Sequence, residues 1–259
     1  MGIIATSVGR IGVEESGDGP RTPIIFLHGV GSDKGVWAPQ IAEFGKSRRS
    51  IAFDYPGYGE SDFIPDATRD DFARAMLAGM DSLEIANAHI CGLSLGGVVA
   101  IAMHALSPKH CASLILADTF AAHPDGQGIY DRSIEASRTI GMRALAEARV
   151  GALVASEAGD DIREDVIETM SRIDPAAYAL GAQAVWLAEQ SDRVASIDLP
   201  SLILVGSEDR ITPPELSEEL AAAISGAFLQ TIVGAGHLAN LEKPLAFNRA
   251  IAAFLGKID

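Results

Sequence analysis

The chain has 259 residues, 48% of them hydrophobic, and a formal net charge of −15 at pH 7. This length and composition indicate a globular chain with a sizeable core rather than a disordered one. The negative charge excludes a nucleic-acid or anionic-membrane surface, because both kinds of surface need clustered lysines and arginines.

Neither a secretion signal nor a membrane span is predicted. The first 15 residues are charged too early for a signal peptide, and no apolar run approaches the roughly 20 residues that a span requires. The two cysteines, Cys91 and Cys111, lie in apolar segments, where a buried free thiol is favoured over a disulfide. We therefore expect a cytoplasmic protein.

Strand and helix patterns alternate through the first 120 residues. Residues 3–15 alternate weakly and end in the turn cluster Ser16–Pro20, which predicts two short antiparallel strands. Apolar runs typical of strands buried on both faces follow at 23–27, 50–53, 88–92 and 113–118. Helical periodicity separates them, over 68–83 and about 94–106, and a short helix is expected near Val36 or Trp37.

The pattern changes between residues 121 and 190. No strand-like run occurs there, and four helical stretches follow one another at 129–139, 142–157, 161–172 and 175–189. Strands resume at 201–206 and 228–233, with helices at 213–224 and 244–255. This alternation indicates a parallel sheet covered on both faces. We predict an α/β core with a mostly parallel, eight-stranded sheet, formed by residues 1–120 and 191–259. Residues 121–190 are then a helical lid inserted after strand six.

The stretch Cys91–Gly97 is the part of the sequence that most directly indicates a catalytic function. Ser94 stands between Gly92 and Gly96 at a strand-to-helix junction, which is the pattern of a nucleophile elbow. So sharp a turn leaves no room for side chains two residues before and after the serine, and its strained backbone is seldom tolerated without a function. Taken alone, the motif is also compatible with a glycine-rich helix start that Ser94 caps.

An acid and a histidine follow the serine in the chain, and their order can be compared with that of known catalytic triads. Asp209 comes directly after the strand 201–206, and His237 comes after the last strand, so both lie at the sheet edge where Ser94 must emerge. The order Ser94, Asp209, His237 is that of α/β-hydrolases and differs from the two common protease orders. Asp118 also ends a strand; it is the alternative acid, or it caps the entrance to the lid.

Each of these residues would have a distinct role. His237 would take the proton of the Ser94 hydroxyl, while Asp209 holds the imidazole and stabilises the imidazolium. The backbone N–H groups of Leu95 and Val30 would form the oxyanion hole, which meets the negative charge that develops on the substrate oxygen.

Taken together, the motifs resemble those of the α/β-hydrolase superfamily. They are Leu27-His28-Gly29, Asp54 with Gly57–Ser61, Gly92–Gly97, Gly206 with Asp209, and Gly236-His237. Three further stretches are similar to the 3-oxoadipate enol-lactonase and small carboxylesterase group, namely Gly35–Gln40, Asp209 with Thr212-Pro213-Pro214, and Gly236–Glu242. The resemblance implies the α/β-hydrolase fold. For the closer group it implies that a serine triad opens an enol-lactone ring without metal or cofactor.

The segment 121–190 departs from that group. An enol-lactonase acts on a carboxylate-bearing lactone, and we would expect a cation in the lid to meet it. This lid has no lysine and twice as many acids as arginines, and its fourth helix carries the apolar stripe Val185–Glu189. We therefore expect a small-molecule substrate with an apolar body.

Six side chains are candidates for the pocket wall, although each could equally be an ordinary core residue or an exposed histidine. They are Trp37, His123, Tyr130, Met142, Trp186 and Leu238. His28 is expected to orient the loop that carries Val30. No metal site is expected, because no closed zinc pattern matches the spacing of the candidate ligands. Those candidates are His89, His104, His110 and Cys111.

The sequence thus predicts a cofactor-independent serine hydrolase of carboxylic esters or lactones that works through an acyl-enzyme on Ser94. A C–C bond hydrolase of a vinylogous diketone from aromatic-ring cleavage is the first alternative, since such enzymes resemble this chain in fold and triad. A ligand receptor on the same fold, with an intact triad and very slow hydrolysis, is the second.

Overall fold

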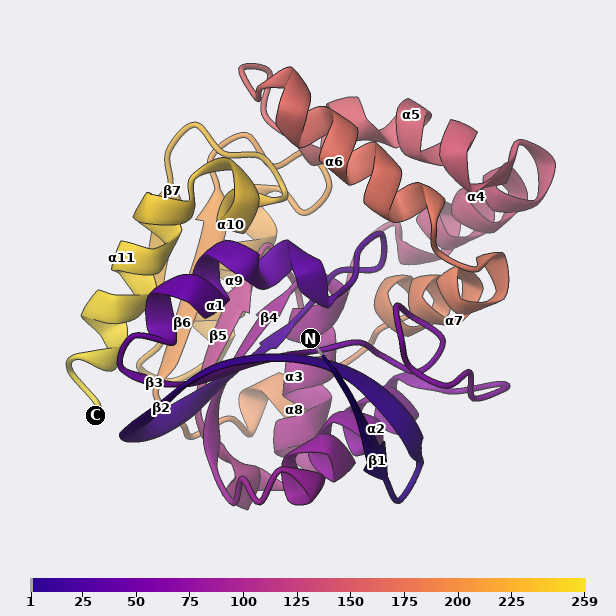
Figure 1. The fold of residues 1–259 in the computed structure, drawn as a ribbon. Helices are drawn as coiled ribbons and strands as arrows, with labels where there is room; N and C mark the ends of the chain where they lie inside the picture. The colour runs from indigo at the N-terminus through magenta and orange to yellow at the C-terminus, as the bar shows by residue number, and fades with distance from the viewer. Residues whose placement is uncertain (1) are drawn as a thin grey trace.

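The computed structural model describes residues 2–259, which fold around one central sheet (Figure 1). The sheet has seven strands in the order β1-β2-β4-β5-β6-β7, and β3 pairs with β2 outside this path. The strands are β1 (Gly2–Thr6), β2 (Gly9–Leu27), β3 (Arg48–Phe53), β4 (Ala88–Leu93), β5 (Cys111–Ala117), β6 (Ser201–Gly206) and β7 (Phe228–Ile232). β1 is antiparallel to β2, whereas the pairs from β4 to β7 are parallel.

The prediction of eight strands is wrong by one, because the two strands expected on either side of Ser16–Pro20 form a single element. β2 runs unbroken through this cluster, with irregular register at its glycine and proline residues. Its two ends flank β3, since Val13 and Leu27 both face Phe53. The partners of Val13–Ser16 run backward from Phe53 to Ser50, and those of Ile24–Leu27 run forward from Ser50 to Phe53. The turn residues between them therefore reverse the direction of the chain within β2.

The hydrophobic core forms two layers, one on each face of the sheet. Alternate side chains of β4 enter different layers, as the two-residue period of a strand requires. Ile90 packs in the layer of the helices α2 (Arg69–Ser82) and α3 (Leu95–Leu106). Cys91 packs in the layer of α1 (Ala38–Phe44) and α11 (Pro244–Leu255). Because helices cover both faces, the strands appear in the sequence as continuous apolar runs.

Five helices lie between β5 and β6, and the first four of them are stacked at one end of the sheet (Figure 1). These four are α4 (Gly126–Thr139), α5 (Gly141–Leu153), α6 (Asp160–Ser171) and α7 (Pro175–Trp186). Their ends agree with the predicted stretches to within about one helical turn. Asp174 caps α7 by accepting a hydrogen bond of 2.7 Å from the N–H of Ala176. A bridge between Ala122 and Glu189 closes the segment at its base.

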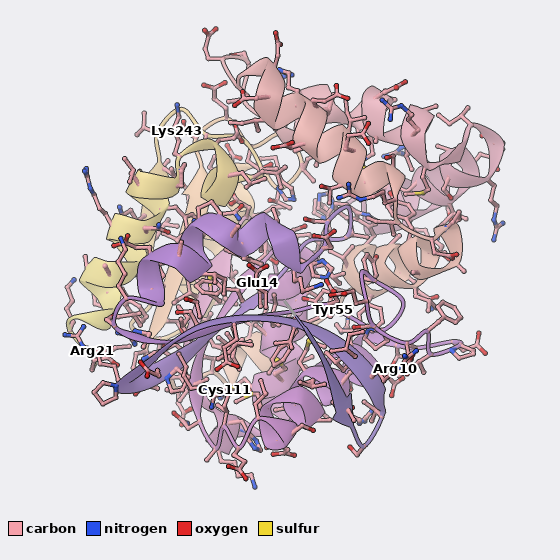
Figure 2. All side chains as sticks on the ribbon, viewed as in Figure 1. Arg10, Glu14, Arg21, Tyr55, Cys111 and Lys243 are labelled. Carbon is pink, nitrogen blue, oxygen red and sulfur yellow. The ribbon has the colours of Figure 1, made fainter. Side chains whose placement is uncertain are left out.

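Shorter elements complete the chain. They are the 3₁₀ helices at Lys34–Trp37 and Pro108–His110, and the helices α8 (Ser191–Ala195), α9 (Pro214–Ala223) and α10 (Ala239–Glu242). None of the helices within residues 2–259 is long and apolar enough to cross a membrane. Figure 2 shows Arg10, Arg21 and Lys243 at the periphery and Tyr55 inside the molecule, where its ring stacks on Phe72 with centroids 5.2 Å apart.

A buried polar cluster ties Asp259 to the sheet. The Arg48 guanidinium donates to the Asp259 carboxylate at 2.5 Å and to the carbonyl of Thr22 at 2.9 Å. The ring of His89 lies between Asp259 and Ser113, with contacts of 2.9 and 2.8 Å. Arg48 and His89 are each only 2% exposed, so their side chains are shielded from water, whereas Asp259 lies at the surface.

Asp259→Asn should lower the free energy of unfolding by about 3 kcal/mol, because it leaves the buried Arg48 guanidinium without a countercharge. Urea denaturation at pH 7 would measure the change. Glu43→Gln is the matched control, since the Glu43–Lys46 ion pair is exposed and its loss should matter far less. Equal effects of the two substitutions would show that the cluster at Asp259 does not stabilise the fold.

Candidate active site

Ser94 lies at the sharp junction between β4 and α3. Its backbone has φ 55° and ψ −113°, and a positive φ is uncommon for a residue other than glycine. Its N–H donates to the carbonyl of Ala117 at 2.9 Å, and its carbonyl accepts from the Thr119 hydroxyl at 2.8 Å. Such strain costs about 1–3 kcal/mol and persists only where the surrounding structure over-determines it.

Gly92 and Gly96 make this junction possible. A Cβ on Gly92 would lie 2.1 Å from the carbonyl oxygen of Gly96, and one on Gly96 would lie 2.0 Å from the carbonyl oxygen of Leu27. Backbone atoms cannot move aside there, so only glycine fits at either position. Within the described chain the Ser94 side chain makes no capping hydrogen bond to α3, which argues against the helix-cap interpretation.

Asp209 follows β6 in a loop that directs its carboxylate to the histidine. Its Oδ1 accepts from the N–H groups of Ile211 and Thr212 at 2.8 and 3.0 Å. Its Oδ2 accepts from the Thr212 hydroxyl at 2.6 Å and lies 2.8 Å from Nδ1 of His237. Both oxygens are therefore held in place. The sequence analysis did not assign this role to Thr212. The feature of the sequence that could have indicated it is the Asp-x-x-Thr spacing, which is typical of a turn held by a side-chain hydrogen bond.

His237 follows β7 and meets Asp209 through Nδ1. Its main-chain N–H donates to the carbonyl of Leu153 at 3.0 Å, which ties the loop to the end of α5. With Nδ1 donating to the carboxylate, Nε2 is left as an acceptor, and this is the tautomer that a general base needs. His237 and Ser94 line the same cavity, although no hydrogen bond joins the two side chains within residues 2–259.

Glu242 supports the histidine loop, a role that sequence reasoning missed. Its carboxylate accepts from the N–H of Gly236 at 2.9 Å and from the N–H of Ala155 at 2.7 Å. It therefore connects the residue before His237 to the chain after α5. Burial raises the pKa of Glu242 above its ordinary value, despite these hydrogen bonds. The feature of the sequence that could have indicated this role is an acid within the apolar stretch that follows the histidine.

The structure brings Asp209, and not Asp118, to His237. Burial raises the pKa of Asp209, but the charge and hydrogen bond of His237, together with those from Thr212, outweigh it and hold the pKa below its ordinary value. Asp118 is fully buried, and Oδ1 accepts from the N–H of Gly206 at 2.8 Å, while Oδ2 has no donor among the described residues. Burial and then the charge of Asp209 raise the pKa of Asp118 well above its ordinary value.

The raised pKa of Asp118 predicts a dependence of stability on pH. The folded protein keeps a proton that the unfolded chain releases, so the free energy of unfolding falls by up to about 1.4 kcal/mol per pH unit above the unfolded pKa. The free energy of unfolding stops falling once the pH exceeds the raised pKa of the folded state. Asp118→Asn removes this titration and should become more stable relative to wild type as pH rises from 5 to 8.

Urea denaturation at several pH values would measure the difference between Asp118→Asn and wild type. The exposed Glu157→Gln serves as control, and its difference from wild type should stay constant across the range. A pH-independent difference for Asp118→Asn would contradict the raised pKa of Asp118. Asp209 acts with the opposite sign, because stability from its lowered pKa is present above the unfolded pKa and is lost as pH falls through the folded pKa.

The two N–H groups predicted for the oxyanion hole lie on the loop and helix that adjoin Ser94. Leu95 is the first residue of α3, so its N–H has no intrahelical acceptor. Val30 lines the cavity, and a Cβ on its neighbour Gly29 would lie 3.7 Å from Cβ of Ser94. His28 is fully buried, and its Nδ1 lies 2.8 Å from the carbonyl oxygen of Gly29, within the loop that it was expected to orient.

The cavity beside Ser94 and His237 has a volume of about 420 Å³. Of the six side chains predicted for its wall, Trp186 and Leu238 line it. The other four do not line it: three pack in the core, and the fourth, His123, lines another cavity. Trp37 packs on Phe26 with ring centroids 4.9 Å apart; Met142 is buried and Tyr130 half-buried in the core layer that includes α4 and α5. His123 lines a separate cavity and meets Trp186 edge-on at 5.5 Å.

The cavity also contains charged side chains that the sequence did not place there. Arg149 and Arg172 line it, together with Asp33, Asp165 and Glu168. Counting acids and arginines in the segment 121–190 could not show which of them face inward, because that depends on how the helices pack. The excess of acids over arginines in this segment thus gave no indication that Arg149 and Arg172 line the cavity.

Comparisons with known proteins agree with this architecture. The family described as alpha/beta hydrolase fold matches residues 22–244. 3-oxoadipate enol-lactonase 1 of Acinetobacter baylyi is 27% identical over 251 residues, covering 96% of this chain and 94% of that protein. The 2-hydroxy-6-oxononadienedioate/2-hydroxy-6-oxononatrienedioate hydrolase of Cupriavidus pinatubonensis is 28% identical over 273 residues, covering 95% and 91%. A thermophilic esterase from Thermogutta terrifontis superposes with a TM-score of 0.91 at 29% identity, covering 99% of this chain and 98% of that one. The predicted fold class and the resemblance to enol-lactonases and esterases are confirmed.

Proposed function

This chain belongs to the α/β-hydrolase fold family, and we propose that it is a serine hydrolase of carboxylic esters or lactones. The observation that carries the proposal is the 2.8 Å contact between His237 and Asp209, beside a cavity that His237 and the strained Ser94 both line. A serine hydroxyl is inert at its free pKa and needs such a base. The relatives named as an enol-lactonase and an esterase point to the same class of reaction.

In this mechanism Nε2 of His237 accepts the proton of the Ser94 hydroxyl while the serine oxygen attacks the scissile carbonyl. Asp209 stabilises the imidazolium, and the N–H groups of Leu95 and Val30 donate to the oxyanion. When the tetrahedral intermediate collapses, His237 returns the proton to the leaving oxygen, and the acyl group stays on Ser94. A water molecule that His237 deprotonates then attacks the acyl-enzyme and releases the acid.

The segment 121–190 would act as the lid over this chemistry. Leu153 of α5, Val166 of α6 and Trp186 of α7 all line the cavity, so the part of the substrate remote from the sheet would contact these helices. Substitutions in this segment should therefore change which substrate is preferred, whereas substitutions at the elbow should change the rate for every substrate.

A second candidate is a C–C bond hydrolase of a ring-cleavage product. The comparison that favours it is the relative from Cupriavidus pinatubonensis, named for hydrolysis of 2-hydroxy-6-oxononadienedioate. The same serine, histidine and acid would be used, and only the scissile bond would differ.

Three kinds of substrate separate the two candidates. Purified protein would be incubated with p-nitrophenyl acetate and butyrate, with small lactones, and with a ring-fission dienoate. We expect the wild type to hydrolyse an ester or a lactone, and we expect Ser94→Ala to abolish this activity. Bleaching of the dienoate without turnover of any ester or lactone would refute the leading proposal and support the second candidate.

A further inference from the structure

The last turn of α5 is attached to the loops of both the histidine and the acid of the candidate triad. The final carbonyl groups of a helix have no donor within the helix. In α5, the carbonyl of Leu153 accepts from the main-chain N–H of His237 at 3.0 Å. The carbonyl of Gly151 accepts at 3.3 Å from the guanidinium of Arg210, the residue after Asp209. The end of this helix is therefore bound to the two loops that the chemistry needs.

The turn after α5 packs against the histidine loop with no space between the two backbones. Val154 and Ala155 are each only 1% exposed. A Cβ on Gly236 would lie 2.6 Å from the main-chain nitrogen of Ala155 and 2.7 Å from the carbonyl carbon of Val154. Only glycine therefore fits before His237. Because glycine restricts its own backbone least of all residues, contacts with the surroundings must set the direction of the chain at this point.

Glu242 supplies such a contact and spans the loop and the turn. Its Oε1 accepts from the N–H of Gly236 at 2.9 Å, and its Oε2 accepts from the N–H of Ala155 at 2.7 Å. The N–H of His237 is held by Leu153, so both of the peptide groups that lead into His237 are fixed by a hydrogen bond. One carboxylate thus holds the histidine loop and the turn in a single arrangement.

The short helix α10, which ends at Glu242, is anchored to the core. Its residue Asn240 is fully buried, and Nδ2 donates to the carbonyl of Val36 at 3.0 Å. The carbonyl of Asn240 accepts from Nε2 of Gln40 at 3.1 Å. The Glu242 carboxylate is therefore presented from a fixed part of the molecule.

The carboxylate of Glu242 is held at a cost to stability. It is half-buried and forms no ion pair within residues 2–259. Burial raises its pKa above the ordinary value, although main-chain N–H groups and the charge of Lys243 act in the opposite direction. A raised pKa in the folded state means that this acid lowers the free energy of unfolding above the pKa of the unfolded chain. A residue kept at such a cost indicates a role other than stability.

We propose that Glu242 is a positioning residue for His237, which it places correctly only while the turn after α5 is seated against the histidine loop. The inference rests on the proposed function and gives the segment 121–190 a second role in it, because this segment then completes the geometry of the triad. Among residues 2–259, the lining of the Ser94 cavity does not include Glu242, so it acts through the backbone. A catalytic group misplaced by about 1 Å can cost about 100-fold in rate.

Glu242→Gln tests the positioning role, because the amide nitrogen cannot accept a hydrogen bond and one of the two N–H groups loses its acceptor. With p-nitrophenyl butyrate, kcat and kcat/KM should fall together by about 10- to 100-fold, while KM changes by less than about twofold. Glu157→Gln is the matched control. It removes the same charge from an exposed position in the same turn, and it should keep the kinetics of the wild type.

Gly236→Ala tests the seating of the turn and leaves Glu242 intact. The added Cβ would force the turn and the loop apart, so kcat should again fall at an unchanged KM. If Glu242→Gln does not fold, Glu242→Asp takes its place, because it keeps the charge on a side chain one methylene shorter. A thermal unfolding scan would show that each variant is folded at the temperature of the assay.

Two measurements do not depend on turnover. In the wild type and in Glu157→Gln, the Nδ1 proton of His237 should give a strongly downfield NMR resonance, because it is hydrogen-bonded to Asp209. In Glu242→Gln this resonance should shift or broaden. The amide hydrogen of Ala155 or Gly236 should also exchange at least about tenfold faster, the effect of losing a hydrogen bond to a charged group.

The outcomes separate this inference from the proposed function. Wild-type kcat in folded Glu242→Gln would overturn the positioning role and leave the serine hydrolase standing, even if the melting temperature fell. Wild-type kcat in Gly236→Ala would overturn the dependence on the seated turn. If the wild type hydrolyses no ester, the proposed function fails and the His237 resonance decides the inference alone. An unchanged resonance in Glu242→Gln would then overturn it.

Discussion

Ser94→Ala should lower kcat for ester or lactone hydrolysis by about 10⁵- to 10⁶-fold, the loss typical of removing a serine nucleophile. Alanine has no oxygen to attack the carbonyl, so no acyl-enzyme can form. The melting temperature should change little, because alanine adopts the same positive φ with a similar penalty and the hydroxyl makes no capping bond to α3. Steady-state kinetics and a thermal unfolding scan on the same preparation would measure both effects.

Ser32→Ala is the matched control for the nucleophile. Ser32 lines the same cavity and is buried, but among residues 2–259 its hydroxyl donates a hydrogen bond only to the carbonyl of Asp33, at 3.4 Å. This variant should keep most of the activity. Turnover by Ser94→Ala at the wild-type rate would exclude Ser94 as the nucleophile and with it the proposed mechanism.

Asp209→Asn should lower kcat by about 10⁴-fold while leaving the fold intact. An amide can still accept from the N–H groups of Ile211 and Thr212, so the loop should keep its shape. It carries no charge to stabilise an imidazolium. If its NH₂ faces His237, it also forces the ring into the tautomer in which Nε2 holds a proton and cannot act as a base.

Asp118→Asn distinguishes the two candidate acids. Because the carboxylate of Asp209 and not that of Asp118 contacts His237, Asp118→Asn should cost far less activity than Asp209→Asn. A greater loss in Asp118→Asn than in Asp209→Asn would transfer the role of the acid to Asp118. The 2.8 Å contact of Asp209 with His237 predicts the opposite order.

The elbow was predictable because its constraint is local. Gly92, Ser94 and Gly96 lie within five consecutive residues, and the clash that excludes side chains arises inside that turn. The acid and the histidine were predictable for a related reason. Parallel strands end at the same edge of a sheet, so residues that directly follow apolar runs lie there together. The structure accordingly brings Asp209 to His237.

Where the prediction failed, the deciding contacts join residues far apart in the chain. The turn cluster Ser16–Pro20 was expected to separate two strands; the chain does reverse direction there, but both halves pair with β3 and form one element, β2. Trp37 and Trp186 are chemically equivalent candidates for a pocket wall. One packs on Phe26 in the core, and the other lines the cavity, because different helices carry them.

The sequence by itself determined the fold class, the glycine-flanked turn at Ser94 and the order of the candidate triad, since apolar periodicity and short glycine motifs encode them locally. Only the tertiary structure decided which side chains of the helices between β5 and β6 line the cavity. The face that each helix between β5 and β6 turns to the cavity depends on packing against its neighbours, which one helix's sequence does not specify. Arg149 shows the difference: in the sequence it is one arginine among many acids, and in the folded chain it lines the same cavity as Ser94.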